Sequence, residues 1–150
     1  MPGIGLYRTR DLGLLLLRLG VGAGFIYFHG LEKLLGGPER WTAVGGAMQY
    51  VGVTVRPDVF GFLAAFAESA GALLIAIGLF FRPAALLLFL TMCLAVIQHL
   101  GTGEGTPAHA FKNAWLFLGL LFLGPGRFSL DAWIDGWRWR GGRRENDLTG

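Results

Sequence analysis

Charged residues and cysteines are scarce in this chain of 150 residues. Asp, Glu, Lys and Arg make up 15% of the sequence, hydrophobic residues make up 53%, and the mean hydropathy is +0.53. Soluble domains contain roughly 25% charged residues, so this composition excludes an ordinary soluble enzyme. The single cysteine, Cys93, lies in an apolar run, so the chain forms no internal disulfide, no C-x-x-C thiol pair and no cysteine-based zinc site.

A basic charge balance does not indicate a nucleic-acid partner here. The net charge is +3 and the isoelectric point is about 9.5. The basic residues, however, lie in short segments beside apolar runs, where charge sets the orientation of a membrane protein. We therefore expect a lipid bilayer as the partner and no nucleic acid.

Four apolar segments are candidates for membrane-spanning helices, because a bilayer core of about 30 Å requires about 20 residues of helix. We expect these spans at residues 12–31, 59–81, 84–100 and 110–123. Only Arg82 and Pro83 separate the second span from the third, so these two helices form an antiparallel hairpin. The predicted fold is all-α, an integral membrane four-helix bundle that forms a single domain over residues 1–150.

Two further segments are expected at the membrane interface. The segment between the first two spans is too polar to cross, but Pro38 suits a first helical position. An interfacial helix from there presents one apolar face, made of Trp41, Val44 and Met48. Residues 131–150 contain tryptophans followed by arginines, which predicts an interfacial tail against anionic headgroups.

The orientation follows from the Lys and Arg residues in the short connections. Eight lie on one side of the predicted bundle, namely Arg8, Arg10, Arg82, Arg127, Arg138, Arg140, Arg143 and Arg144. Four lie on the other, namely Lys33, Arg40, Arg56 and Lys112. We therefore expect both termini and the tail to be cytoplasmic. On the first span, Gly20 and Gly24 are spaced to permit close helix contact and a homo-oligomer.

Arg18 and Glu68 are the only charged residues inside the first and second spans. Such a group in hydrocarbon costs several kcal/mol unless it is paired or hydrated. With a rise of about 1.5 Å per residue, Arg18 lies roughly 10 Å from the cytoplasmic end and Glu68 roughly 15 Å from the outer end. We expect them to form a buried polar centre. Two hypotheses remain open: an ion pair that fixes helix register, and a proton or ligand site.

A second polar group is predicted at the outer rim. The topology gathers His29 and Lys33 from the first span, His99 from the third, and His109 and Lys112 from the fourth. Neutral imidazole both donates and accepts hydrogen bonds, so these histidines suit a quinone carbonyl, or a metal or haem. Alternatively, they only meet water and headgroups. Their spacing matches no metal signature, so no metal site is predicted, and a quinone is favoured over haem.

Three groups of motifs carry a resemblance to a known family. They are Arg18-Leu19-Gly20 with Gly30-Leu31-Glu32-Lys33-Leu34, then Glu68-Ser69-Ala70-Gly71 with Ile77-Gly78-Leu79-Phe80-Phe81-Arg82-Pro83-Ala84-Ala85, and finally Gly124-Pro125-Gly126-Arg127-Phe128-Ser129-Leu130-Asp131. Together they resemble the DoxX family of small bacterial membrane proteins with four helices, which is related to the DoxD subunit of thiosulfate:quinone oxidoreductase. The resemblance extends from about Leu14 to Asp131.

The resemblance implies a multi-pass protein of the bacterial inner membrane with characteristic polar positions at Arg18, Lys33, Glu68, Arg82 and Asp131. It also implies a subunit or accessory component of a membrane redox system, linked to quinone or to thiol and oxidative stress, with a redox partner protein. Many relatives have an acidic, aromatic pattern where this chain has Phe111-Lys112-Asn113-Ala114-Trp115. Two alternatives are a noncatalytic scaffold that anchors a partner protein, and a path for a small solute or ion. The sequence assigns no catalytic residue.

Overall fold

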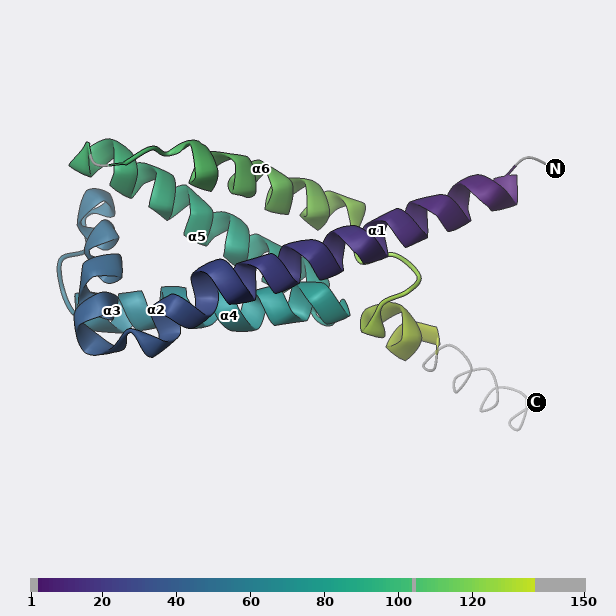
Figure 1. Cartoon of the computed structure of the whole chain (residues 1–150), viewed down its shortest axis with the longest axis horizontal. Coiled ribbons are helices and arrows are strands. Elements are labelled where there is room, and N and C mark those ends of the chain that lie inside the picture. The colour runs from purple at the N-terminus through teal and green to yellow at the C-terminus, as the bar shows by residue number, and fades with distance from the viewer. Residues whose placement is uncertain (1–2, 104, 137–150) are drawn as a thin grey trace, which may run out of the picture.

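The computed structural model describes residues 3–103 and 105–136, and this part of the chain consists of helices and short connections, without strands (Figure 1). Its elements are α1 (Gly3–Phe25), the π-helical turn η1 (Ile26–Gly30), α2 (Leu31–Leu35), α3 (Gly37–Gly45), the 3₁₀ turn η2 (Gly46–Val51), α4 (Pro57–Ile77), α5 (Phe81–Thr102) and α6 (Ala108–Leu123). Residues 130–136 are also helical. The all-α prediction is confirmed for this part of the chain.

Among the described residues, three helices are long and apolar enough to cross a membrane. They are Thr9–Leu35, Pro57–Ile77 and Phe81–Thr102, whereas the apolar helix α6 has 16 residues. In Figure 1, α1, α4, α5 and α6 extend along the long axis, α3 lies across one end, and the start of α1 and residues 130–136 lie at the opposite end. Large apolar side chains such as Leu16, Phe66 and Phe122 are exposed on these helices, as expected where helices meet lipid instead of water.

The observed helix at the first predicted span is longer than residues 12–31. Helix continues from Thr9 to Leu35, because α1, η1 and α2 follow one another without a break. The π-helical turn Ile26–Gly30 contains one predicted site residue, His29, and precedes another, Lys33, by three positions. Single π-turns within α-helices are rare and occur frequently at functional sites.

The turn between α4 and α5 differs from the prediction. α4 ends at Ile77, where Gly78 takes the left-handed conformation (φ 70°), and α5 begins at Phe81. The predicted turn at Arg82 and Pro83 is therefore wrong, although the antiparallel hairpin is correct. Pro83 lies in the first turn of α5, where a backbone N–H has no partner within the helix and its loss has little effect.

The side chain of Asp131 caps the start of α5. Its two carboxylate oxygens accept hydrogen bonds from the backbone N–H groups of Phe80 (2.9 Å) and Phe81 (3.0 Å). The backbone N–H of Asp131 in turn donates to the carbonyl of Gly78 at 2.9 Å. The segment after α6 is thereby fastened to the α4–α5 turn.

The predicted helix after Pro38 is present as α3, and it packs directly against the start of α4. A Cβ atom added at Gly61 would collide with the Trp41 carbonyl, and one added at Gly45 would collide with the Pro57 carbonyl. The two backbones therefore touch. The Trp41 ring also meets Phe62 edge to face at 5.0 Å. Placement of α3 at the membrane surface stays a prediction, and residues 137–150 of the predicted tail lie outside the described residues.

Candidate functional site

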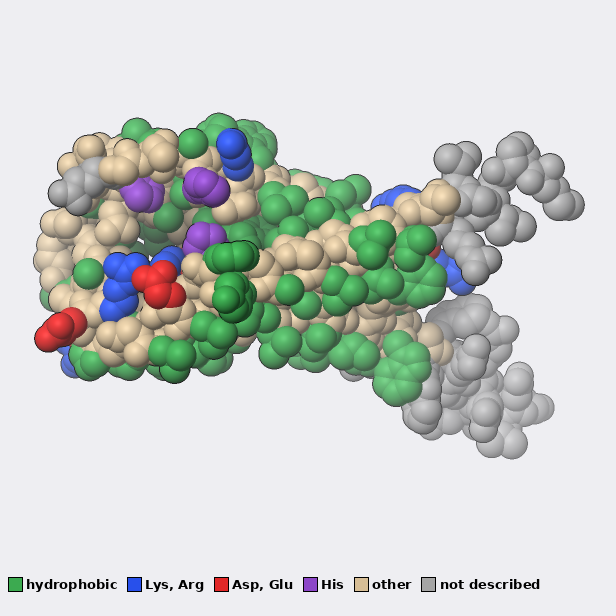
Figure 2. Space-filling model, in the orientation of Figure 1, with side chains coloured by type: hydrophobic (Ala, Val, Ile, Leu, Met, Phe, Trp, Pro, Cys, Tyr) green, Lys and Arg blue, Asp and Glu red, His purple; other side chains and the backbone are tan. Residues whose placement is uncertain are grey.

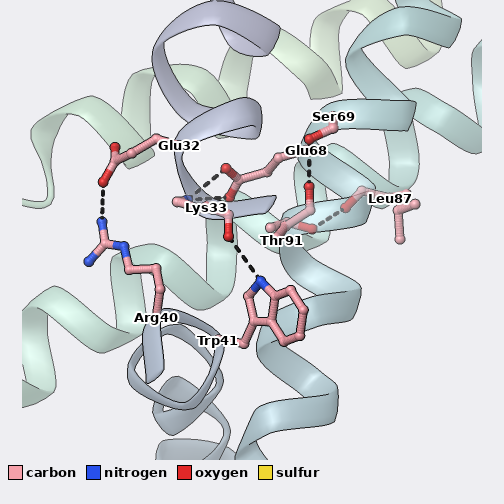
Figure 3. Close-up of polar contacts among 9 residues, drawn as sticks. Glu32, Lys33, Arg40, Trp41, Glu68, Ser69, Leu87 and Thr91 are labelled. Atoms are coloured by element: carbon pink, nitrogen blue, oxygen red, sulfur yellow. Dashed lines mark hydrogen bonds and ion pairs between the residues drawn. The ribbon is translucent and has the colours of Figure 1, made fainter. Parts of the chain in front are cut away.

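Glu68 forms its ion pair with Lys33, so the hypothesis of an Arg18–Glu68 ion pair is wrong. Lys33 Nζ donates to both carboxylate oxygens, at 2.7 Å to Oε1 and 2.6 Å to Oε2 (Figure 3). The Glu68 side chain is 1% exposed and the Lys33 side chain is 19% exposed. The pair joins the end of the first span to the middle of α4.

Arg18 is equally buried but lies in a different place. Its guanidinium group donates to the carbonyl oxygens of Pro125 (2.8 Å) and Phe128 (2.5 Å), in the segment that follows α6. Its Nε is buried without a hydrogen-bond partner among the described residues. The guanidinium contacts Gly78, which lies ten residues, or about 15 Å of helix, beyond Glu68. Arg18 and Glu68 therefore belong to two separate polar centres.

Several contacts hold Lys33 in position. The Trp41 indole Nε1–H donates to the Lys33 carbonyl at 2.9 Å, which ties α3 to the end of α2. Nearby, Arg40 on α3 pairs with Glu32 at 2.9 Å (Figure 3). Gly30 lies directly against Ser69 on α4, the residue after Glu68. These contacts fix the backbone from which the Lys33 side chain reaches Glu68.

A cavity of about 630 Å³ adjoins this ion pair. It lies between α3 and η2 on one side and α4 and α5 on the other. Its polar lining includes Lys33, Arg40, Glu68, Thr91, Gln98 and His99. Its apolar lining includes Val44, Met48, Phe60, Leu63, Leu87 and Leu90. Its volume lies within the range of roughly 300–1,000 Å³ typical of small-molecule sites.

The polar groups lie at two depths in the cavity. Leu88 of α5 packs against Gly71 of α4. Since the two helices are antiparallel, Thr91, three residues further along α5, lies level with Glu68, three residues back along α4. Gln98 lies another seven residues along α5, toward the end of the molecule where α3 lies, about 10 Å away. The ion pair therefore marks the inner part of the cavity, and Gln98 and His99 mark its rim.

The structure brings only part of the predicted outer cluster to the cavity. Lys33 and His99 line it, whereas His29, His109 and Lys112 do not. His29 is half-buried, with its ring 5.0 Å from that of Phe25, and it lies within electrostatic reach of Lys33, Glu68 and His109. His109 and Lys112 are exposed. Figure 2 shows charged and histidine side chains gathered at the end of the molecule that α2 and α3 form.

Arg40 and Thr91 are among the polar lining residues that sequence reasoning did not assign to the site. Helical spacing could have identified both. Arg40 lies four residues before Val44, on the predicted apolar face of α3. Thr91 lies seven residues before Gln98, two turns along the same face of α5.

The comparison with known families agrees with the first two groups of motifs noted above, whereas the third group, at residues 124–131, lies beyond the matched residues. A model of the DoxX family matches residues 13–100. The matched segment includes Arg18, Lys33 and Glu68 and ends before α6. No curated protein and no solved structure matches the chain.

Proposed function

This chain belongs to the DoxX family, and from that premise we propose that it is a component of a membrane redox system that binds a quinone in the cavity between α3, α4 and α5. The buried Lys33–Glu68 pair at the inner part of this cavity is the observation that carries the proposal. A buried pair is not by itself a source of stability. Its position at the wall of a ligand-sized cavity favours a role in binding.

The chemistry of the lining suits a quinone head group. Lys33 has three N–H donors, some of which Glu68 takes, and Gln98 has two, one of which reaches the Ala43 carbonyl at 3.5 Å. The ring of His99 adds a further N–H donor. Quinone carbonyls are acceptors without donors, so they complement such a wall. The leucine, valine, methionine and phenylalanine side chains between these groups suit the ring and its apolar substituents.

The proposal includes a topology. We assign a fourth crossing to α6, which at 16 residues is about 24 Å long and needs a locally thinner bilayer. Both termini and the tail are then cytoplasmic, in the inner membrane of a bacterium. Single cysteines placed in a Cys93→Ser background test this. Thr106→Cys should react with an impermeant maleimide on intact cells, and Asp135→Cys only after permeabilisation.

The quinone proposal is tested by the thermal stability of the detergent-purified protein with and without ubiquinone and menaquinone analogues. We expect a quinone-dependent rise in Tm for the wild type and for the exposed control variants Glu39→Gln and His109→Gln. The rise should be lost in His99→Gln and Glu68→Gln. An absorption spectrum of the same sample tests for haem.

Absence of any quinone-dependent shift in the wild type would contradict the proposal. The noncatalytic scaffold would then be the better hypothesis, with capture of a partner protein as the next experiment. A shift that persists unchanged in His99→Gln and Glu68→Gln would place a quinone elsewhere on the protein and would equally contradict the assignment of this cavity.

A further inference from the structure

Apolar side chains of α4 and α5 line one side of the cavity. Three leucines line it and still expose about half of their surface: Leu63 at 52%, Leu87 at 45% and Leu90 at 51%. A side chain that faces both the cavity and the surroundings marks an opening. We call these three residues the bilayer portal.

The portal lies at the depth of the hydrocarbon. Glu68 is eleven residues from the start of α4, about 16 Å along a helix that crosses a core of about 30 Å. Leu88 contacts Gly71, which sets how far α5 is displaced along α4. In this register Leu87 and Leu90 lie at the depth of Glu68 or slightly further toward the end of α4. Neighbouring side chains on the same helices, Phe66 and Leu86, are also exposed and apolar. The portal therefore faces acyl chains and not water.

The outer end of the cavity is covered instead. α3 contacts α4 backbone to backbone at Gly61, and the ring of Tyr50, in η2, packs on Gly101 near the end of α5. The cover is thus fastened to both helices that flank the cavity. A ligand with an apolar tail meets the portal from within the bilayer without disturbing either contact.

We propose that the ligand enters from the bilayer through this portal and leaves its apolar tail between Leu63, Leu87 and Leu90 while its head group lies beside Lys33 and Glu68. This inference rests on the proposed quinone site and narrows its substrate class. The ligand is a membrane-dissolved quinone whose tail contributes to recognition, and a tailless, water-soluble quinone is a poor ligand.

The experiment compares two quinones that share a ring, decylubiquinone and the tailless ubiquinone-0, by calorimetric titration of the full chain in nanodiscs. The variants are Leu87→Trp and Leu90→Trp, in which the larger side chain fills the portal. The control is Leu86→Trp, at a residue that is exposed on α5 but does not line the cavity. Partitioning of the tailed quinone into lipid is the same for all proteins and cancels between variants.

We expect the portal variants to weaken binding of decylubiquinone by about tenfold or more, because burying two methylene groups already corresponds to about a tenfold change. Ubiquinone-0 should bind the wild type more weakly than decylubiquinone does, and this weak binding should be the same in every variant. The control Leu86→Trp should bind decylubiquinone as the wild type does. Equal losses for both quinones, or no loss for decylubiquinone, would overturn the portal while leaving the quinone site in place. If the wild type binds neither quinone, both the proposed function and the portal are overturned.

Discussion

The Lys33–Glu68 pair should be energetically coupled, whereas Arg18 and Glu68 should not be. Lys33→Met leaves the Glu68 carboxylate, 1% exposed, without its partner. Stranding a buried charge in this way costs about 3–5 kcal/mol. Glu68→Gln is milder, at about 1–3 kcal/mol, because the lysine, 19% exposed, can turn into the cavity.

The double variant Lys33→Met/Glu68→Gln removes both charges and leaves none stranded. Its destabilisation should be smaller than the sum of the two single effects by about 1–3 kcal/mol, the coupling typical of residues in contact. The assay is reversible unfolding in mixed micelles with increasing SDS. These losses fall within the stability of about 5–15 kcal/mol of an ordinary folded domain, so the variants should still be measurable.

The matched control is Arg18→Gln combined with Glu68→Gln. These residues lie about 15 Å apart along the helix axis, and effects at such distances usually add within about 0.5 kcal/mol. Additive effects for Lys33 and Glu68, or a coupling between Arg18 and Glu68 of more than about 1 kcal/mol, would refute the assignment of the pair.

Three further predictions concern the contacts that build the site, each measured by the same unfolding assay. Gly61→Ala should destabilise by about 1–3 kcal/mol, because the new Cβ collides with the Trp41 carbonyl, while Gly46→Ala, where the Cβ has open space, should behave as wild type. Arg18→Met should cost about 3 kcal/mol through the loss of two charge-assisted hydrogen bonds to backbone carbonyls, and a cost below about 1 kcal/mol would contradict their importance. Asp131→Ala should cost about 1–2 kcal/mol, because two N–H groups at the start of α5 lose their acceptor.

The sequence predicted the membrane helices well because their signal is local. Apolar length alone identifies the helices that include Leu16, Phe66 and Leu90. Their ends were less certain, since Gly78 was included in the second span although it terminates α4. Proline is suited both to a loop between helices and to the first turn of a helix, and Pro83 lies in the first turn of α5.

The polar centres were identified without their partners. The cost of burying charge in a membrane identified Arg18 and Glu68. Counting residues along each helix, however, estimates the depth of a residue's backbone and not that of the end of a long side chain. The backbone of Lys33 lies near the rim of the cavity, yet its flexible side chain extends inward to Glu68. The partners of Arg18 are carbonyl oxygens, which carry no signal in the sequence.

The cavity could not be predicted at all. It depends on α3 folding back over α4 and α5, and that fold depends on the backbone contact at Gly61 and on the hydrogen bond from Trp41 to the Lys33 carbonyl. These are contacts between segments whose relative placement no local pattern specifies. The apolar face of α3 was recognised, but whether it covers lipid or protein was not.

Photolabelling with an azidoquinone, followed by mass-spectrometric mapping of the labelled residues, tests directly whether a quinone binds in this cavity. We expect labels on the cavity-lining residues of α4 and α5, between Leu63 and His99. Excess unlabelled quinone should compete these labels away, and they should decrease in His99→Gln. Labels spread over the lipid-facing surfaces of α1 and α6, with no effect of competitor, would contradict a quinone site in this cavity.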